Sequence, residues 1–233
     1  MDLIGIITSG INIIAQATNE SGVLNWIAEK YEAGGIFMHP ILASFIVGLG
    51  FCFERLWTLS RSKVNTKQFI LKVKKTLDEG GIEAAKELCA NTRGPIASVF
   101  FAGLLRADEG LDAAEKAIMT YGGIEMGFLE RGLIWISLFI TLAPMLGFTG
   151  TVQGMIEAFD AIKEAAQISP SIVAEGIAIA LLTTLFGLVV AMILQVFYNY
   201  FVSRIDRLVA DMEEASVELI DALYERTVQK GKK

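Results

Sequence analysis

Cysteine and histidine are scarce in this chain of 233 residues, which holds two cysteines and one histidine. Cys52 lies in an apolar stretch and Cys89 in a charged one, a separation that favours two free thiols over a disulfide framework or a metal site. His39 has no second ligand near it in the sequence. Because no serine–histidine–acid set or paired-carboxylate pattern occurs either, we expect neither an enzyme nor a bound metal or cofactor.

A surplus of basic residues is also missing. The chain has 20 lysines and arginines against 26 acidic residues, a formal net charge of −6, which argues against nucleic acid as a partner. The glycine-rich run GFTGTVQG at residues 147–154 lacks the Gly-Lys-Ser/Thr ending of a phosphate-binding loop. We therefore reject nucleotide binding.

Formal charge is absent from three long runs, residues 36–53, 132–156 and 176–201. Each run has about the length that a helix needs to cross a bilayer, roughly 20 residues. With 53% hydrophobic residues overall, the sequence predicts an all-α membrane protein. Its three transmembrane helices interact with membrane lipids and carry long cytoplasmic helical extensions.

Lysine and arginine predict the orientation of the spans. Eleven of the 20 basic residues fall between residues 61 and 131, and six follow residue 201. The positive-inside rule then places the N-terminus in the periplasm and the C-terminus in the cytoplasm. The predicted segments are a periplasmic segment (1–35), a first span (36–60), a cytoplasmic region (61–131), a second span (132–158), a short periplasmic loop (159–171), a third span (172–201) and a cytoplasmic helix (202–233).

Residues 3–19 are uncharged and rich in isoleucine. We interpret them as an amphipathic helix on the outer membrane surface. A cleaved signal peptide and a fourth span remain alternatives, since Ala15-Gln16-Ala17 resembles a cleavage site.

The cytoplasmic region is predicted to be helical, with a break at Gly80-Gly81 and a helix opened by a capping box at Asp112 and Glu115. Apolar residues recur at three- and four-residue intervals after the third span, which predicts an amphipathic helix packed on the central helices of its own or a neighbouring subunit. They include Ile205, Leu208, Met212, Leu219 and Leu223. Glu54-Arg55 at the end of the first span is interpreted as a mutually neutralising interfacial pair.

Small residues form a stripe on each of the last two spans, which lets helices approach closely. These residues are Gly147, Gly150 and Gly154 in the second span, and Gly176, Ala180, Gly187 and Ala191 in the third. Hydroxyls accompany both stripes, at Thr151 and at Thr184 or Thr183. From spacing alone the stripes fit plain helix packing, with each threonine bonded within its own helix, or a polar path between helices.

Several motifs together resemble the MotA/TolQ/ExbB proton-channel family, most closely its ExbB/TolQ branch. They are the first span ending in Glu54-Arg55, the pattern Pro144-x-x-Gly147-x-x-Gly150-Thr151-Val152-x-Gly154, the run Gly176-Ile177-Ala178-x-Ala180-Leu181-x-x-Thr184-x-x-Gly187-Leu188, and Tyr198-Asn199. The resemblance implies a homo-pentamer whose second and third spans line a central pore. It also implies a dimer of single-span ExbD/TolR-type partners in that pore and a TonB- or Pal-type arm.

The resemblance places the family's pore threonines at Thr151 and Thr184, and its second-span proline at Pro144. Two positions depart from the ExbB/TolQ pattern: Ile179 stands where that pattern has an intramembrane glutamate, and Gln153 stands where it has a tryptophan. Glu175 lies one turn before Ile179 on nearly the same helix face. We hypothesise that Glu175 takes up protons at the outer mouth.

The expected function is that of a channel-forming stator subunit in a proton-motive-force motor of the bacterial inner membrane. The motor would energise outer-membrane transport or envelope maintenance. A membrane scaffold without ion flux and a sodium-driven relative are the alternatives.

Overall fold

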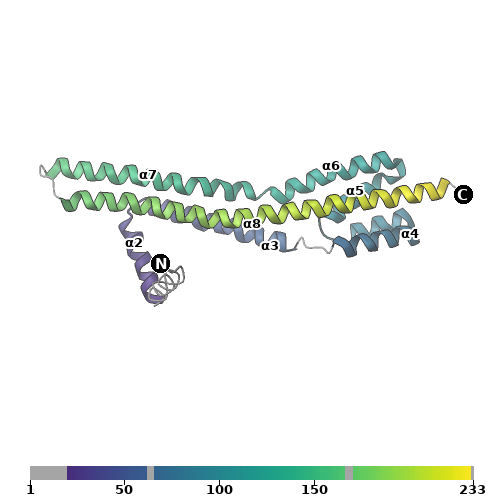
Figure 1. Ribbon diagram of the computed structural model, residues 1–233, viewed down its shortest axis with the longest axis horizontal. Coiled ribbons are helices and arrows are strands. Elements are labelled where there is room, and N and C mark those ends of the chain that lie inside the picture. Colours follow the sequence, from purple (N-terminus) through teal and green to yellow (C-terminus); the bar gives the residue numbers. More distant parts are fainter. Residues whose placement is uncertain (1–19, 62–65, 166–169, 232–233) are drawn as a thin grey trace, which may run out of the picture. The chain divides into compact units, whose positions relative to one another are not determined.

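The computed structural model describes residues 20–61, 66–165 and 170–231, which fold into a series of helices (Figure 1). The predicted amphipathic helix over residues 3–19 lies outside the described residues. The helices are α2 (Glu20–Ala33), α3 (Met38–Arg61), α4 (Thr66–Ala90), α5 (Pro95–Arg106), the 3₁₀ turn η1 (Ala107–Glu109), α6 (Leu111–Glu130), α7 (Leu133–Ala165) and α8 (Pro170–Gly231). No β-strand occurs in the described ranges, so the all-α prediction is confirmed.

Three helical stretches among the described residues are long and apolar enough to cross a membrane, Met38–Ser60, Leu111–Glu164 and Val173–Val228. Their number agrees with the three predicted spans. The helices are longer than the spans, however. Residues 159–165 of the predicted periplasmic loop 159–171 are helical, because α7 continues to Ala165. Glu157 ends the uncharged run, but the helix continues past it, with the charged side chains of Glu157, Asp160 and Lys163 exposed.

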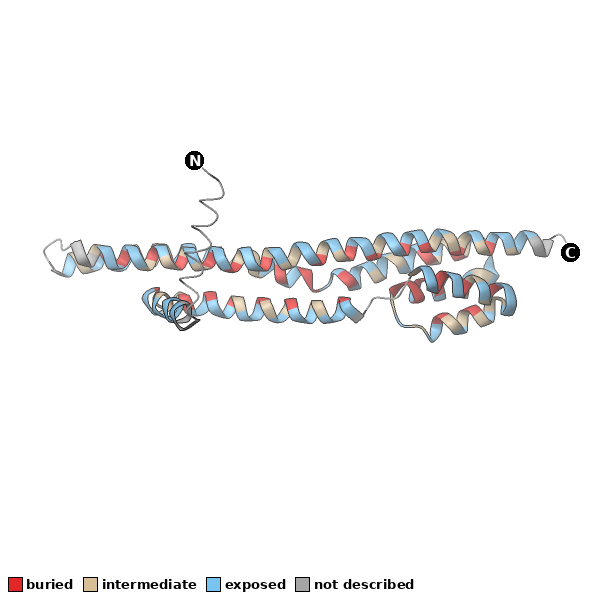
Figure 2. Cartoon of the chain, turned by 60° about the horizontal axis from the view of Figure 1, so that its bottom comes forward, coloured by how far each residue is buried: buried red, intermediate tan, exposed pale blue. Residues whose placement is uncertain are grey.

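The third span and the amphipathic segment after it are one helix, α8. The apolar residues that the sequence singled out in this segment are buried, among them Ile205, Met212 and Leu219. Figure 2 shows buried positions recurring along α8 at helical intervals. This pattern is the burial of one face of an amphipathic helix.

The chain divides into two compact units, each described here by itself. The first comprises residues 1–49 and 138–195. Its helices meet closely at Gly48, where an added Cβ would lie 2.8 Å from Leu194 Cδ1 and 3.5 Å from Phe139 Cβ. In lipid such contacts rest on van der Waals packing, because lipid tails are as apolar as leucine.

The second unit comprises residues 50–137 and 196–233. Phe100 is fully buried in α5, and its ring centroid lies 5.7 Å from that of Phe69 in α4. Lys74 Nζ of α4 donates to Glu218 Oε2 of α8 at 2.7 Å. The C-terminal helix therefore packs on the central helices of its own chain.

Two predicted signals in the second unit had different outcomes. The break at Gly80-Gly81 is confirmed, because Gly81 has φ of +81° inside α4, a conformation that glycine adopts at little cost. The capping box at Asp112 is wrong: α6 begins at Leu111, and its N-cap is Gly110, which has no side chain to accept a hydrogen bond. Asp112 lies instead in the first turn of α6, where its negative charge interacts favourably with the helix dipole.

Candidate functional site

Helices α7 and α8 approach each other closely because glycines line α7 where α8 crosses it. An added Cβ at Gly147 would lie 2.8 Å from the carbonyl oxygen of Thr183, and one at Gly154 would lie 2.9 Å from that of Gly176. At Gly150 the added atom would lie 2.6 Å from Thr183 Oγ1. These distances leave no room for a side chain, so backbone faces backbone along this contact.

Glycines of α8 complete the contact. An added Cβ at Gly187 would lie 2.6 Å from the carbonyl oxygen of Ala143, and one at Gly176 would meet Ala158 Cβ at 2.5 Å. Ala180 is buried beside Gly154, whereas Ala191 is half-buried one turn beyond Gly187. The small residues of both predicted stripes except Ala191 thus lie in direct contact between α7 and α8 of one chain.

Thr151 and Thr184 lie opposite each other across this contact, and their hydroxyls are hydrogen-bonded to each other. Thr151 Oγ1 also lies 3.2 Å from the carbonyl oxygen of Gly147 and 3.2 Å from that of Ala180. Thr184 Oγ1 lies 3.3 Å from the Gly147 carbonyl oxygen. Two hydroxyls and two backbone carbonyls therefore form one polar cluster between apolar helices.

The hydrogen bonds of this cluster can point in either of two directions. Each hydroxyl has one hydrogen, so when Thr151 donates to Thr184, Thr184 donates to the Gly147 carbonyl. When Thr184 donates to Thr151 instead, Thr151 donates to a carbonyl of its own helix or of α8. A pair that satisfies both arrangements can pass a proton from one side to the other without holding a charge in the membrane, where charge is costly.

Thr183 and Thr149 differ from this pair. Thr183 is fully buried, and its hydroxyl donates only to carbonyls of its own helix, Ile179 at 3.1 Å and Ala180 at 3.0 Å. Thr149 is exposed and bonds the Met145 carbonyl one turn back at 2.8 Å. The packing interpretation, in which a threonine bonds within its own helix, describes Thr183 and Thr149, whereas Thr184 bonds across to α7.

Pro144 is half-buried inside α7. Proline has no N–H, so the helical hydrogen bond to the carbonyl of Ile140 is missing. The freed carbonyl lies two turns before Gly147 along the helix. Pro144 thus adds a further polar backbone group to the half of α7 that precedes the threonine pair.

The acids nearest to the pair in the sequence lie towards the C-terminal end of α7 and the N-terminal end of α8. Glu175 is exposed beside Gly176. Ile179, which stands where the family pattern has a glutamate, packs near Gly35: its Cγ2 lies 3.5 Å from an added Cβ there. Gln153, which departs from the family pattern, donates from Nε2 to Glu157 Oε1 at 3.0 Å. Sequence reasoning did not single out Glu157 and so missed this pair. The signal was the i, i+4 spacing of an amide and an acid.

Glu54 and Arg55 form the ion pair that the sequence suggested. Arg55 Nε donates to Glu54 Oε2 at 2.8 Å, and the arginine side chain is only 11% exposed. Arg55 Nη1 also lies 3.4 Å from the carbonyl oxygen of Leu129 in the last turn of α6. An added Cβ at Gly132 would clash with Arg55 Nε at 2.1 Å, so the guanidinium occupies the break between α6 and α7.

Neither cysteine suggests a metal or redox site. Burial raises the pKa of the Cys89 thiol to about 12, which keeps it protonated and unreactive. In the described part of the chain, no three histidine, cysteine or acidic residues gather as metal ligands would.

Comparison with known proteins identifies the family. A family model described as the MotA/TolQ/ExbB proton channel family matches residues 91–214, which is more than half of the chain and includes both threonines of the pair. The chain belongs to this family. Its relatives place it in the ExbB/TolQ branch.

Three relatives illustrate the similarity. The chain is 34% identical over 182 residues to an ExbB homologue from Methanothermobacter thermautotrophicus, a match that covers 77% of this chain and 64% of that protein. It is 31% identical over 93 residues to the biopolymer transport protein ExbB of Salmonella typhimurium, covering 40% of this chain and 38% of that protein. It is 30% identical over 107 residues to the Tol-Pal system protein TolQ of Haemophilus influenzae, covering 46% and 47%.

Proposed function

We propose that this chain is the channel-forming stator subunit of a motor driven by the proton-motive force in a bacterial inner membrane. The observation that carries the proposal is the hydroxyl pair of Thr151 and Thr184 between two spans of a proton-channel family member. The pair supplies hydrogen-bonding groups without supplying a titrating group. A partner must therefore bring the acid that is protonated and released.

The proposed assembly is a homo-pentamer around a pore, with a dimer of single-span ExbD/TolR-type partners inside it. Large apolar side chains of α6 outside the uncharged runs support an assembly of several chains. Met119 is 69% exposed and Phe128 is 55% exposed. Apolar surface of this kind, in a region that we place in the cytoplasm, is covered in stable proteins by another subunit.

The proposed topology has the N-terminus in the periplasm and the C-terminus in the cytoplasm, as the basic residues of the central region and the tail favour. The output is transmitted through a TonB-like arm, to energise outer-membrane transport or maintain the envelope. The names of the relatives, biopolymer transport for ExbB and the Tol-Pal system for TolQ, support these two outputs equally.

Alanine substitution of the threonine pair tests the pore role. With the partner present, proton uptake into vesicles should fall by about tenfold or more in Thr151→Ala and Thr184→Ala, since positioned proton-transfer groups contribute factors of roughly 100 to 10,000. Thr149→Ala is the matched control and should transport normally, because that hydroxyl is exposed and bonded within its own helix.

The alternatives predict other results. A scaffold without ion flux gives no uptake in the wild type, and a sodium-driven relative gives uptake of sodium in place of protons. Equal uptake in the wild type and both alanine variants would rule out the hydroxyl pair as a proton path.

Glu175 is the proposed acid for proton uptake at the outer mouth. Glu175 is exposed near the start of α8, an end of the helix that we place at the periplasmic side. Glu175→Gln should lower proton uptake more than Glu164→Gln, which removes an exposed acid of α7 further from the span. Normal uptake in Glu175→Gln would exclude this role.

A further inference from the structure

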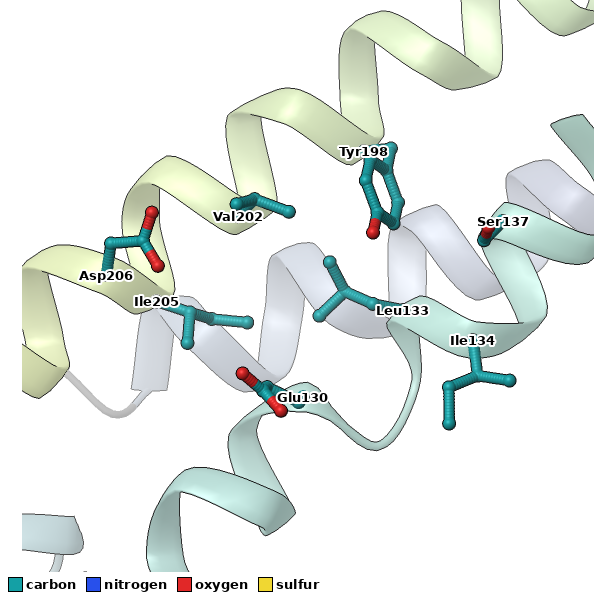
Figure 3. A pocket seen from close by; sticks show the side chains of 8 residues that line it. All are labelled: Glu130, Leu133, Ile134, Ser137, Tyr198, Val202, Ile205 and Asp206. Atoms are coloured by element: carbon teal, nitrogen blue, oxygen red, sulfur yellow. The ribbon is translucent and has the colours of Figure 1, made fainter. Parts of the chain in front are cut away.

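A hollow of about 430 Å³ opens in the second unit beside the break between α6 and α7 (Figure 3). Four polar side chains line it: Glu130 from the end of α6, Ser137 from α7, and Tyr198 and Asp206 from α8. In Figure 3 the Tyr198 hydroxyl points into the space between the helices, while the carboxylates of Glu130 and Asp206 lie on the far side from Ser137. The hollow thus has a hydroxyl end and a carboxylate end.

The two ends fall on opposite sides of a boundary in the sequence. Ser137 and Tyr198 belong to the uncharged runs 132–156 and 176–201, whereas Glu130 and Asp206 lie just outside them. A hollow lined in this way begins at membrane depth and opens among charged residues. In the proposed topology this opening faces the cytoplasm.

The arginines close to these carboxylates in the sequence do not form ion pairs with them. The Arg131 guanidinium lies over the Phe128 ring, 5.6 Å from its centroid. Arg204 lines a separate hollow with Leu56 and Tyr200. Neither Glu130 nor Asp206 takes part in an ion pair formed among the described residues. The lining of the hollow thus contains two acids and no basic side chain.

We propose that this hollow is the site where protons leave for the cytoplasm, an inference that rests on the proposed channel function. Water in the hollow delivers a proton to the Tyr198 hydroxyl oxygen as that hydroxyl gives its own proton outward, so its charge is unchanged. An ionised carboxylate, Glu130 or Asp206, accepts the proton and then returns it to bulk water. The groups end each cycle as they began, and no oxidant or other reactant is needed.

The test measures proton uptake into vesicles that contain the full chain with its single-span partner. Uptake should fall about tenfold in the double variant Glu130→Gln/Asp206→Asn and several-fold in Tyr198→Phe, which removes only one oxygen atom. The exchange variant Glu130→Asp/Asp206→Glu should restore uptake. The matched control Asp112→Asn/Glu213→Gln removes the same charge from exposed positions of the same two helices and should transport normally.

Each outcome decides the proposal. Normal uptake in Glu130→Gln/Asp206→Asn and in Tyr198→Phe, with loss in Thr151→Ala, would overturn the exit site and leave the channel function intact. If the double variant does not assemble, normal uptake in Tyr198→Phe overturns the proposal and several-fold loss supports it. Equal loss in the double variant and its charge-matched control would assign the effect to overall charge and contradict the proposal. Absence of uptake in the wild type would refute the channel function and the exit site together.

Discussion

At the scale of single residues, the contact between α7 and α8 depends on glycines, which have no side chain. Gly147 faces the backbone carbonyl of Thr183, which cannot rotate away as a side chain could. The same glycines bring Thr151 within hydrogen-bonding distance of α8. Packing and the proposed chemistry are therefore two consequences of one close approach.

Gly147→Ala should destabilise the protein, because its Cβ would lie 2.8 Å from the Thr183 carbonyl oxygen and would force the helices apart. Overpacking of this kind costs about 1–3 kcal/mol. Thermal unfolding in detergent measures the effect. Gly127→Ala is the control: this α6 glycine has open space around it, so alanine should stabilise by up to about 1 kcal/mol. Equal melting temperatures for Gly147→Ala and the wild type would contradict the close contact.

Cys89 should react slowly with iodoacetamide in the folded protein. Burial raises the pKa of its thiol from 9.0 to about 12, so at pH 8 the thiolate fraction is roughly a thousandfold lower than in the unfolded chain. Labelling of a Cys52→Ala background, followed by mass spectrometry with and without denaturant, measures this ratio. Labelling at one rate in both states would show that Cys89 is not buried.

The same pKa shift predicts a pH dependence of stability. Between pH 9 and 12 the unfolded chain loses the Cys89 proton while the folded chain keeps it. Raising the pH through this window therefore favours unfolding. Cys89→Ala should weaken the decline in the melting temperature above pH 9. An unchanged decline in this variant would assign the pH dependence to other groups.

At the scale of elements, the break between α6 and α7 is held by Arg55 of α3. Its guanidinium neutralises Glu54 and reaches the Leu129 carbonyl, one of the groups that a helix end leaves without a partner. Arg55→Gln should lower the free energy of unfolding by about 1–3 kcal/mol, because it leaves polar groups of a largely buried site unsatisfied. Arg207→Gln, at an exposed position of α8, should change it by less than about 0.5 kcal/mol. Similar effects of both substitutions, measured by chemical denaturation, would contradict the role of Arg55.

The sequence predicted the helices more completely than the site. The uncharged runs predict spans because the bilayer excludes charge, and Gly80-Gly81 predicts a break because it disfavours a regular helix. Spacing did not separate Thr184 from Thr183, since neighbouring residues both border the same stripe and only the position of α7 distinguishes them. The hollow of Glu130, Tyr198 and Asp206 was also missed, because its residues come from distant segments that share no motif.

For the whole molecule, the account requires several copies of the chain. The exposed apolar side chains of α6, Met119 and Phe128, would be covered by a neighbouring chain. The proposed pore also requires several chains around it. Native mass spectrometry of the detergent-solubilised complex should give the mass of five 25.4-kDa chains, with two copies of the partner added when it is coexpressed. A monomer or dimer that transports protons normally would contradict the pentameric pore.

The reversal potential of the current through the reconstituted complex of this chain and its partner tests the central claim most directly. With a tenfold proton gradient and equal sodium on both sides, the account predicts a shift of about 59 mV towards the proton equilibrium potential. A tenfold sodium gradient at equal pH should give no shift. A potential that follows sodium, or the absence of any current above that of empty membranes, would contradict the assignment of this chain as a proton-channel subunit.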